Sequence, residues 1–188
     1  MLRPAPFQPG EGTDERSLIE RARHGDTRAF EQLADQHLPH LYRLAAAMVG
    51  PDDARDVTQD TLVSAWRDLP GLRDADRFEA WLRSILMNRA RNVLRTRKRH
   101  PQVAFEPTLV HPAGFTEEPM TAVHRQLAIH DALGELGPDH RAIIVLHYLA
   151  DLPLREVADI LGLREGTTKS RLHAGLTALR AQFGEGPS

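Results

Sequence analysis

The stretch 154–174 constrains the fold of this chain more than any other part of the sequence. Pro153 stands where the first turn of a helix tolerates proline, and Gly162 can take the left-handed conformation that ends a helix. The apolar face between them consists of Val157, Ala158, Ile160 and Leu161. A second helix is expected to begin near Glu165 and to bury the stripe Leu172, Leu176 and Leu179. Two helices joined by a glycine turn predict a helix-turn-helix.

Polar side chains occupy the start of this second helix, largely away from the leucine stripe. They are Thr167, Thr168, Lys169, Ser170 and Arg171, with Arg164 just before them. A helix of this kind fits the major groove and presents its side chains to base edges and phosphates. The alternative is an ordinary helical hairpin, and the small local excess of cations does not decide between the two. We interpret these six residues as a DNA contact.

The whole chain limits the class of protein further. Its 188 residues have room for one large domain or two small ones, and the apolar residues follow helical spacing without sustained alternation, which predicts an all-α fold. No cysteine is present, so disulfides and cysteine metal sites are excluded. We expect His37 and His40 to be partly exposed helix positions and predict no metal site. The net charge of −2 argues against a protein that holds DNA by bulk charge alone.

Several other classes are disfavoured by what the sequence lacks. It has no apolar run of about eighteen residues, so we expect no membrane insertion and a cytoplasmic protein. The proline-rich segment 1–12 does not resemble a signal peptide and is expected to be a disordered tail. No nucleophile–base pair, phosphate loop or metal set is apparent, so we expect neither an enzyme nor a cofactor.

Helical spacing predicts four helices before residue 100. Their expected starting residues are Thr13, Asp26, Asp52 or Asp53, and Asp74 or Asp76, and the second helix is expected to continue through Pro39 with a kink. The fourth helix should bury Phe78 and Trp81 in its first half. Its second half carries six cations in eleven residues and no acid: Arg89, Arg91, Arg95, Arg97, Lys98 and Arg99. A solvated helix end is the alternative, but such a concentrated patch favours nucleic-acid contact.

A proline-rich segment separates this part of the chain from the helix-turn-helix. Residues 100–120 hold four prolines and no helical stripe, which is typical of a flexible linker. Thr121 can cap a following helix, and Gly137 with Pro138 opens another. The sequence therefore predicts two small helical domains, at 13–99 and 121–184, joined by the linker 100–120.

Three motifs in these domains resemble the sigma-70 family of bacterial RNA polymerase specificity subunits, in particular its small extracytoplasmic-function (ECF) group. Residues 52–66, DDARDVTQDTLVSAW, are similar to the family's region 2.2, the helix that binds core polymerase. The run from Phe78 through Asn88 to the arginine cluster resembles regions 2.3 and 2.4, which melt and read the −10 element. Residues 133–179, with GTTKSRL at 166–172, resemble region 4, which reads the −35 element.

The resemblance implies a role for each motif. It implies contact with core RNA polymerase by Asp53, Asp56, Gln59 and Asp60, the last three of which share one helix face. It implies contact with −10 DNA by Asn88, Arg91, Asn92, Arg95, Arg97 and Lys98, with the loop 72–77 forming a pocket for a flipped base. Promoter DNA and core polymerase are the implied partners, and an anti-sigma factor is a further candidate.

These observations predict an alternative sigma factor that binds core polymerase, directs it to specific promoters and helps open the −10 region. A free-standing helix-turn-helix regulator, which would bind a palindrome as a dimer, is the first alternative. Such a regulator would not need the face formed by Asp56, Gln59 and Asp60. A helical hydrolase that uses some of the ten histidines is the second alternative.

Overall fold

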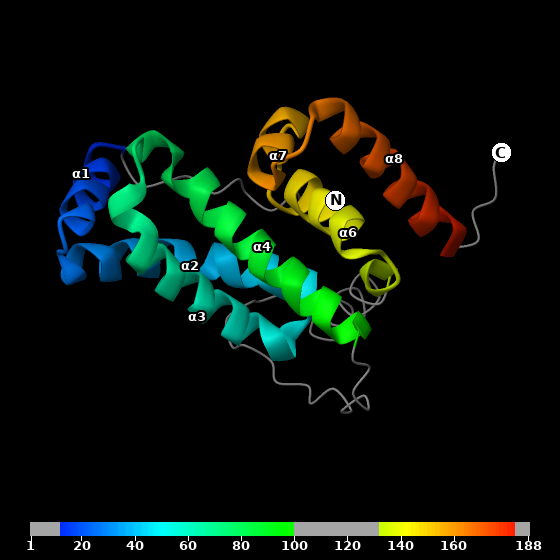
Figure 1. Ribbon diagram of the computed structural model, residues 1–188, viewed down its shortest axis with the longest axis horizontal. Helices are drawn as coiled ribbons and strands as arrows, with labels where there is room; N and C mark the ends of the chain where they lie inside the picture. The colour runs from blue at the N-terminus through cyan, green and yellow to red at the C-terminus, as the bar shows by residue number, and fades with distance from the viewer. Residues whose placement is uncertain (1–11, 100–131, 183–188) are drawn as a thin grey trace, which may run out of the picture.

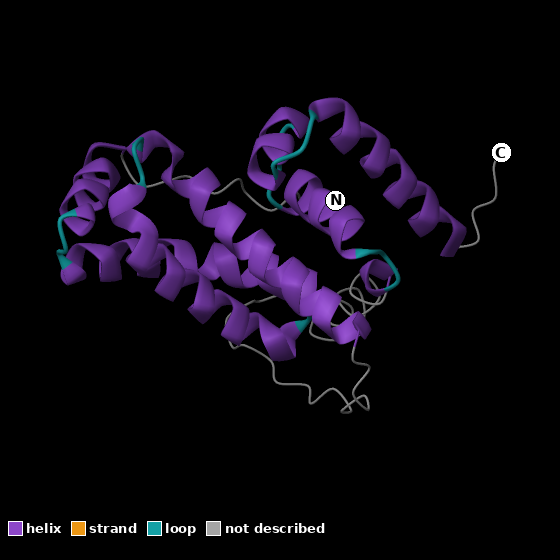
Figure 2. Ribbon diagram, in the orientation of Figure 1, coloured by secondary structure: helices purple, strands orange, loops and turns teal. Residues whose placement is uncertain are grey.

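The computed structural model describes residues 12–99 and 132–182. Within these ranges the chain is helical and contains no strand (Figure 2), which confirms the all-α fold expected from the helical spacing. The predicted linker 100–120, the tail before residue 12 and the predicted start of a helix at Thr121 lie outside the described residues. The kink expected at Pro39 stays a prediction, although α2 does continue through this proline.

The described residues 12–99 form four α-helices and two short 3-10 turns. They are α1 (Gly12–Arg23), α2 (Thr27–Val49), α3 (Pro51–Asp68), η1 (Leu69–Gly71), η2 (Ala75–Arg77) and α4 (Phe78–Arg99). Asp26 caps α2 as predicted, because its Oδ1 accepts a hydrogen bond from the Ala29 amide at 3.1 Å. Gly50, at φ 89°, separates α2 from α3.

Three helix starts differ by a few residues from the expected ones. The first helix begins at Gly12 rather than after Thr13, and α3 begins at Pro51, which is favoured at a first helical position. Asp74 caps the 3-10 turn η2 instead of α4, by accepting from the Asp76 amide at 3.0 Å. A preferred proline position and a side-chain cap therefore set two of these starts, at α3 and η2, more finely than the apolar spacing does.

The core of this part lies between α2, α3 and α4, and Phe78 belongs to it as expected, whereas Trp81 is half-buried. The expectation of partly exposed histidines was wrong. His37 and His40 are 2% and 5% exposed, because they lie on the inward face of α2. The His37 Nε2 is 2.9 Å from Glu15 Oε1 on α1, and its ring meets Phe78 edge-on with centroids 5.4 Å apart.

The second part contains the predicted helix-turn-helix. Its elements are α6 (Pro138–Ile144), the π-helical turn η3 (Val145–Leu149), α7 (Leu154–Leu161) and α8 (Glu165–Gln182). Gly162 ends α7 in the left-handed conformation at φ 65°, and α8 starts at Glu165, so both predictions are confirmed. Leu172 is buried, while Leu176 and Leu179 are partly buried.

The two parts pack against each other in this arrangement, with α7 on α4, α6 on α2 and α4, and η3 on α2 (Figure 1). Arg141 of α6 is buried at this contact. Its Nε donates to the Leu133 carbonyl at 2.6 Å, and its Nη1 donates to the Met48 carbonyl at the end of α2. Burial lowers the pKa of Arg141, and the nearby Arg97 lowers it further.

Candidate nucleic-acid interface

The second half of α4 presents the predicted cation cluster, but most of its arginines are already engaged within the chain. Arg97 donates to the Val49 carbonyl at 3.0 Å and pairs with the carboxylate of Asp53. Arg91 Nη2 donates to Asn88 Oδ1 at 2.6 Å. The outward positions Asn88, Asn92, Arg95 and Lys98 are exposed. All six residues predicted to contact −10 DNA therefore lie on one helix, α4, but their side chains differ in how exposed they are.

The α4 arginines and the helix-turn-helix also meet directly. Arg91 and Arg95 approach Oδ1 of Asp139, on α6, at 3.4 and 3.1 Å, and Arg171 approaches its Oδ2 at 3.8 Å. Asp139 was not among the residues singled out from the sequence, where it is only an acid after a proline. No local pattern reveals this contact, because its partners lie more than thirty residues away on either side.

The helix-turn-helix presents most of the predicted −35 residues at its surface. Arg164, Lys169 and Ser170 are exposed, whereas Thr167 and Arg171 are half-buried. The Ser170 hydroxyl donates to the Thr167 carbonyl at 3.0 Å. These five side chains lie on or beside the first turns of α8, where a recognition helix carries its base and phosphate contacts.

Thr168 differs from its neighbours because it is completely buried. Its hydroxyl donates to the Arg164 carbonyl, one turn earlier, at 3.2 Å. Thr168 stands four residues before Leu172, so it belongs to the buried stripe rather than to the polar face. The predicted contact of this side chain with DNA is therefore not compatible with the arrangement seen here.

The predicted polymerase-binding face lies on α3. Asp56, Gln59 and Asp60 are exposed along it, and Asp53 is half-buried at its start. Asp60 pairs with Arg89 of α4, with Oδ2 3.1 Å from Nη1. The ion pairs Asp53–Arg97 and Asp60–Arg89 therefore connect the predicted polymerase-binding helix to the predicted −10 helix.

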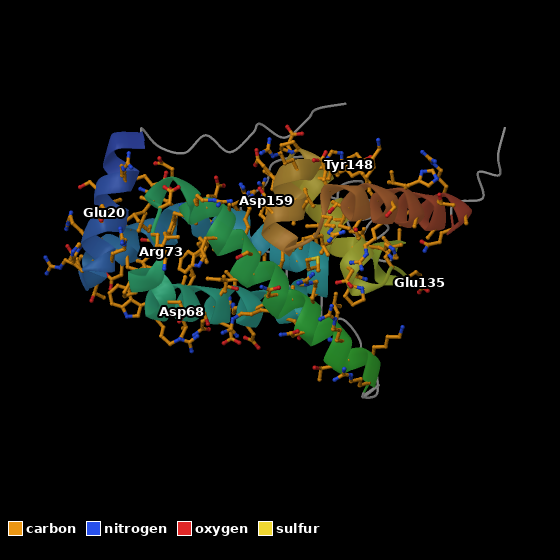
Figure 3. All side chains as sticks on the ribbon, turned by 45° about the horizontal axis from the view of Figure 1, so that its top comes forward. Glu20, Asp68, Arg73, Glu135, Tyr148 and Asp159 are labelled. Atoms are coloured by element: carbon orange, nitrogen blue, oxygen red, sulfur yellow. The ribbon has the colours of Figure 1, made fainter. Side chains whose placement is uncertain are left out.

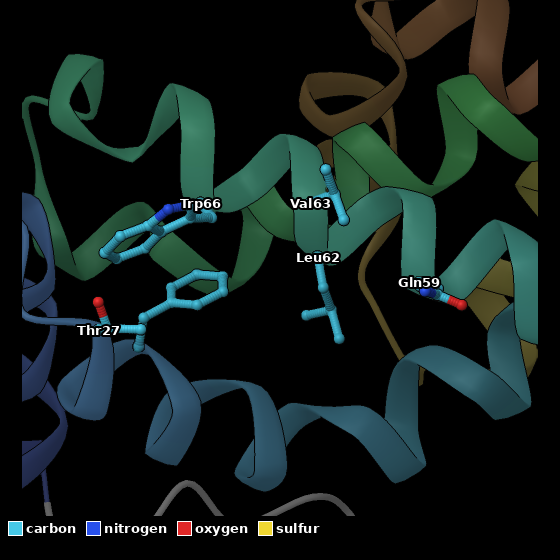
Figure 4. A pocket seen from close by; sticks show the side chains of 6 residues that line it. Thr27, Gln59, Leu62, Val63 and Trp66 are labelled. Carbon is cyan, nitrogen blue, oxygen red and sulfur yellow. The ribbon is translucent and has the colours of Figure 1, made fainter.

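An apolar hollow continues this face toward α2 (Figure 4). It is lined by Thr27, Phe30, Gln59, Leu62, Val63 and Trp66. The Phe30 and Trp66 rings pack with centroids 5.0 Å apart, while Val63 leaves 62% of its surface exposed. This hollow was not predicted from the sequence, although Val63 stands four residues after Gln59 and so shares its helix face.

The loop 72–77, expected to form a base pocket, buries Leu72 and Ala75 and exposes its charged residues. Asp76 approaches Arg16 of α1 at 3.8 Å, and Arg77 approaches Asp159 of α7 at 4.0 Å. Figure 3 shows Arg73 of this loop and Asp159 among the surface side chains. The pocket for a flipped base stays a prediction.

In the described ranges, 12–99 and 132–182, no group of histidine and carboxylate side chains could hold a metal ion. Among the helices of these ranges, none combines the length and the apolar character needed to cross a bilayer.

Family models match both parts of the chain. The sigma-70 region 2 model matches residues 33–100, and the sigma-70 region 4 model matches residues 126–179. The ECF RNA polymerase sigma factor SigL of Mycobacterium tuberculosis is 34% identical over 155 residues, covering 81% of this chain and 88% of that protein. The RNA polymerase sigma factor CarQ of Myxococcus xanthus is 32% identical over 168 residues, covering 89% and 96%.

Two solved structures are similar over most of the chain. CnrH in complex with the cytosolic domain of CnrY matches with a TM-score of 0.68 and 29% identity, covering 90% of this chain and 97% of that one. The sigma factor RpoE in complex with the anti-sigma factor NepR, from Bartonella quintana, matches with a TM-score of 0.65 and 27% identity, covering 86% and 100%.

Proposed function

The chain belongs to the sigma-70 family as an ECF sigma factor, and from this premise we propose that it binds core RNA polymerase, directs it to specific promoters and helps open the −10 region. One observation supports this most strongly. The same chain presents a helix-turn-helix with an exposed polar face and, on α3, a separate acidic and apolar surface suited to a protein partner. A free-standing regulator would need only the first of these surfaces.

The polymerase-binding surface proposed here is larger than the acidic face alone. Asp56 and Gln59 supply exposed polar groups, and Val63 with the neighbouring hollow supplies apolar area. An exposed apolar patch rimmed by polar groups is typical of a protein interface. The occupant that we propose, following the family resemblance, is the coiled-coil clamp of the largest polymerase subunit. Asp53 and Asp60 contribute at the rim of this surface. There the polymerase has to compete with Arg97 and Arg89 for their carboxylates.

Two further surfaces are proposed to read the promoter. Residues 13–99 form one domain, whose −10 surface consists of Asn88, Arg91, Asn92, Arg95, Arg97 and Lys98. Residues 121–184 form the other domain, whose −35 surface consists of Arg164, Thr167, Lys169, Ser170 and Arg171. Thr168 is left out because its side chain is buried. Because the polymerase contributes to the affinity for DNA, a chain with a net charge of −2 can still recognise promoter DNA.

The remaining parts of the proposal concern where and how the protein acts. We place it in the cytoplasm, where it acts as an initiation factor and not as a catalyst. The similar proteins CnrH and RpoE were solved in complex with CnrY and the anti-sigma factor NepR. By analogy, an anti-sigma factor is the regulatory partner that we propose for this chain.

Co-elution with core RNA polymerase tests the function, followed by run-off transcription on genomic fragments. The wild-type chain is expected to co-elute and to produce new start sites. Asp56→Ala with Gln59→Ala is expected to weaken polymerase binding by roughly tenfold, because truncating key interface residues commonly costs 1 kcal/mol or more. Circular dichroism should show unchanged helicity, since both side chains are exposed.

The control variant also removes one carboxylate and one amide side chain, but at positions outside the proposed polymerase-binding surface. Asp159→Ala with Gln182→Ala changes an exposed acid and an exposed amide on α7 and α8, away from α3. This variant should co-elute like the wild type. A wild-type chain that fails to bind polymerase but retains duplex DNA would overturn the sigma-factor function in favour of a free-standing regulator.

A further inference from the structure

Three arginines from the two proposed DNA surfaces converge on a single carboxylate. Asp139 is approached by Arg91 at 3.4 Å and by Arg95 at 3.1 Å, both from the −10 surface on α4. Arg171, from the −35 surface on α8, lies 3.8 Å from the other oxygen of the same carboxylate. Asp139 therefore connects two surfaces that must each face DNA during promoter recognition.

The position of Asp139 is fixed by its neighbours on α6. Arg141, two residues later, is buried and donates to the Met48 carbonyl at the end of α2. This contact anchors α6 to the end of α2, and α6 also packs against α4. The carboxylate of Asp139 is 36% exposed and Arg91 is only 13% exposed, so at least one of the three pairs is shielded from solvent and from screening by salt.

A carboxylate and a phosphate compete for the same arginine donors. The planar guanidinium forms charge-assisted hydrogen bonds with either group in a similar geometry. An arginine that points at Asp139 must turn away from it before it can contact a DNA phosphate. Two arginines of the −10 surface and one of the −35 surface are subject to this competition at once.

We propose that Asp139 is an intramolecular competitor for the DNA backbone, which holds Arg91, Arg95 and Arg171 and, together with the packing of α6 and α7 on α2 and α4, helps to keep the two DNA-reading surfaces closed against each other in the free chain. Promoter phosphates displace Asp139, and the two surfaces separate when they engage DNA. This inference rests on the proposed function, because it assigns these arginines to DNA. The pair Arg77–Asp159, at 4.0 Å and with both side chains mostly exposed, adds only a minor contact between the same two parts.

Duplex binding by the full chain tests the competition. The probe is a fluorescein-labelled duplex of arbitrary sequence and about 20 base pairs, or two helical turns, used in about 50 mM salt so that phosphate contacts dominate. Asp139→Asn keeps the size of the side chain and removes its charge. Its affinity for the duplex, measured by fluorescence anisotropy, is expected to rise roughly three- to tenfold, because each arginine released can neutralise a phosphate.

The matched control is Glu135→Gln, which removes one negative charge four residues earlier at an exposed position (Figure 3). This variant changes the net charge by the same amount, so it reports the general effect of charge on DNA affinity. Tighter binding by Asp139→Asn than by Glu135→Gln supports the competition. Equal affinities of the two variants, or weaker binding by Asp139→Asn, would overturn it.

A second measurement needs neither DNA nor polymerase. The chain has no cysteine, so Asp68→Cys and Ala178→Cys, at exposed positions on α3 and α8, can carry a donor and an acceptor dye. Adding Asp139→Asn is expected to lengthen the mean distance between the dyes, whereas adding Glu135→Gln is not. An unchanged distance would overturn the closing role of Asp139 even if polymerase co-elution confirmed the sigma-factor function. If the distance between the dyes lengthens but the wild-type chain does not co-elute with polymerase, only the sigma-factor function is refuted.

Discussion

Replacing Thr168 by valine distinguishes the contact predicted from the sequence from the position seen in the structure. The sequence places Thr168 among the residues that read DNA, whereas the structure buries it completely on the inward face of α8. If the side chain of Thr168 only packs in the interior, Thr168→Val leaves promoter-directed transcription unchanged. If the hydroxyl contacts DNA, transcription falls while the stability of the chain stays the same.

The size of the stability change follows from the hydrogen bonds at this position. The Thr168 hydroxyl donates to the Arg164 carbonyl at 3.2 Å, and the same carbonyl accepts the helical hydrogen bond of the Thr168 amide at 3.0 Å. Removing the hydroxyl therefore leaves no buried acceptor unpaired, which limits the loss to about 0.5–1 kcal/mol. The additional buried methyl group of valine offsets this by about 0.8 kcal/mol, so the free energy of unfolding should change by less than about 1 kcal/mol.

Urea unfolding followed by circular dichroism measures the free energy of unfolding of each variant. Run-off transcription with core polymerase measures its promoter-directed activity. Thr168→Ala should be less stable than Thr168→Val by about 1.5–2 kcal/mol, because alanine lacks both of the buried methyl groups that valine carries. Lys169→Ala, at the exposed neighbouring position, should instead lower transcription with little change in stability. A loss of transcription in Thr168→Val as large as that in Lys169→Ala, at wild-type stability, would refute the buried role of Thr168.

Two further predictions concern stability. Gly162→Ala should lower the free energy of unfolding by about 1 kcal/mol, because its φ of 65° is strained for a residue with a Cβ; the control Gly166→Ala, helical and with open space around the added Cβ, should raise it by about 0.5 kcal/mol. Burial, aided by the positive charge of Arg83, lowers the pKa of His40 to about 4. Because the unfolded chain binds this proton near its ordinary pKa of about 6.5, stability should fall by up to about 3 kcal/mol as the pH drops from about 6.5 to 4. An NMR titration in which His40 changes charge near pH 6.5 would contradict this.

Much of the fold was predictable because the signals that encode it are local. The cap at Asp26, the stop at Gly50 and the left-handed turn at Gly162 depend on residues within a few positions of one another. The start of α3 differed because Pro51 takes the first helical position, which proline favours, instead of a side-chain cap at Asp52 or Asp53. The polar face of α8 was also predictable, since helical spacing decides which side chains lie together.

The proposed interfaces were predictable only in part. Spacing placed Asp56, Gln59 and Asp60 on one face, and the structure exposes all three. It did not show that Val63 and a neighbouring hollow extend that face, because the hollow needs Phe30 from α2 as well as residues of α3. The burial of Thr168 was not predicted either, although its position four residues before Leu172 places it on the leucine stripe.

The sequence by itself determined which residues form helices and which of them share a helix face, because both depend on hydrogen bonds and contacts between residues three or four positions apart. Only the tertiary structure decided which faces turn inward and which charges meet. His37 and His40 are buried because α1, α3 and α4 close around α2. Asp139 meets its three arginines because α6 lies between α4 and α8, an arrangement set by the packing of apolar faces over the whole chain.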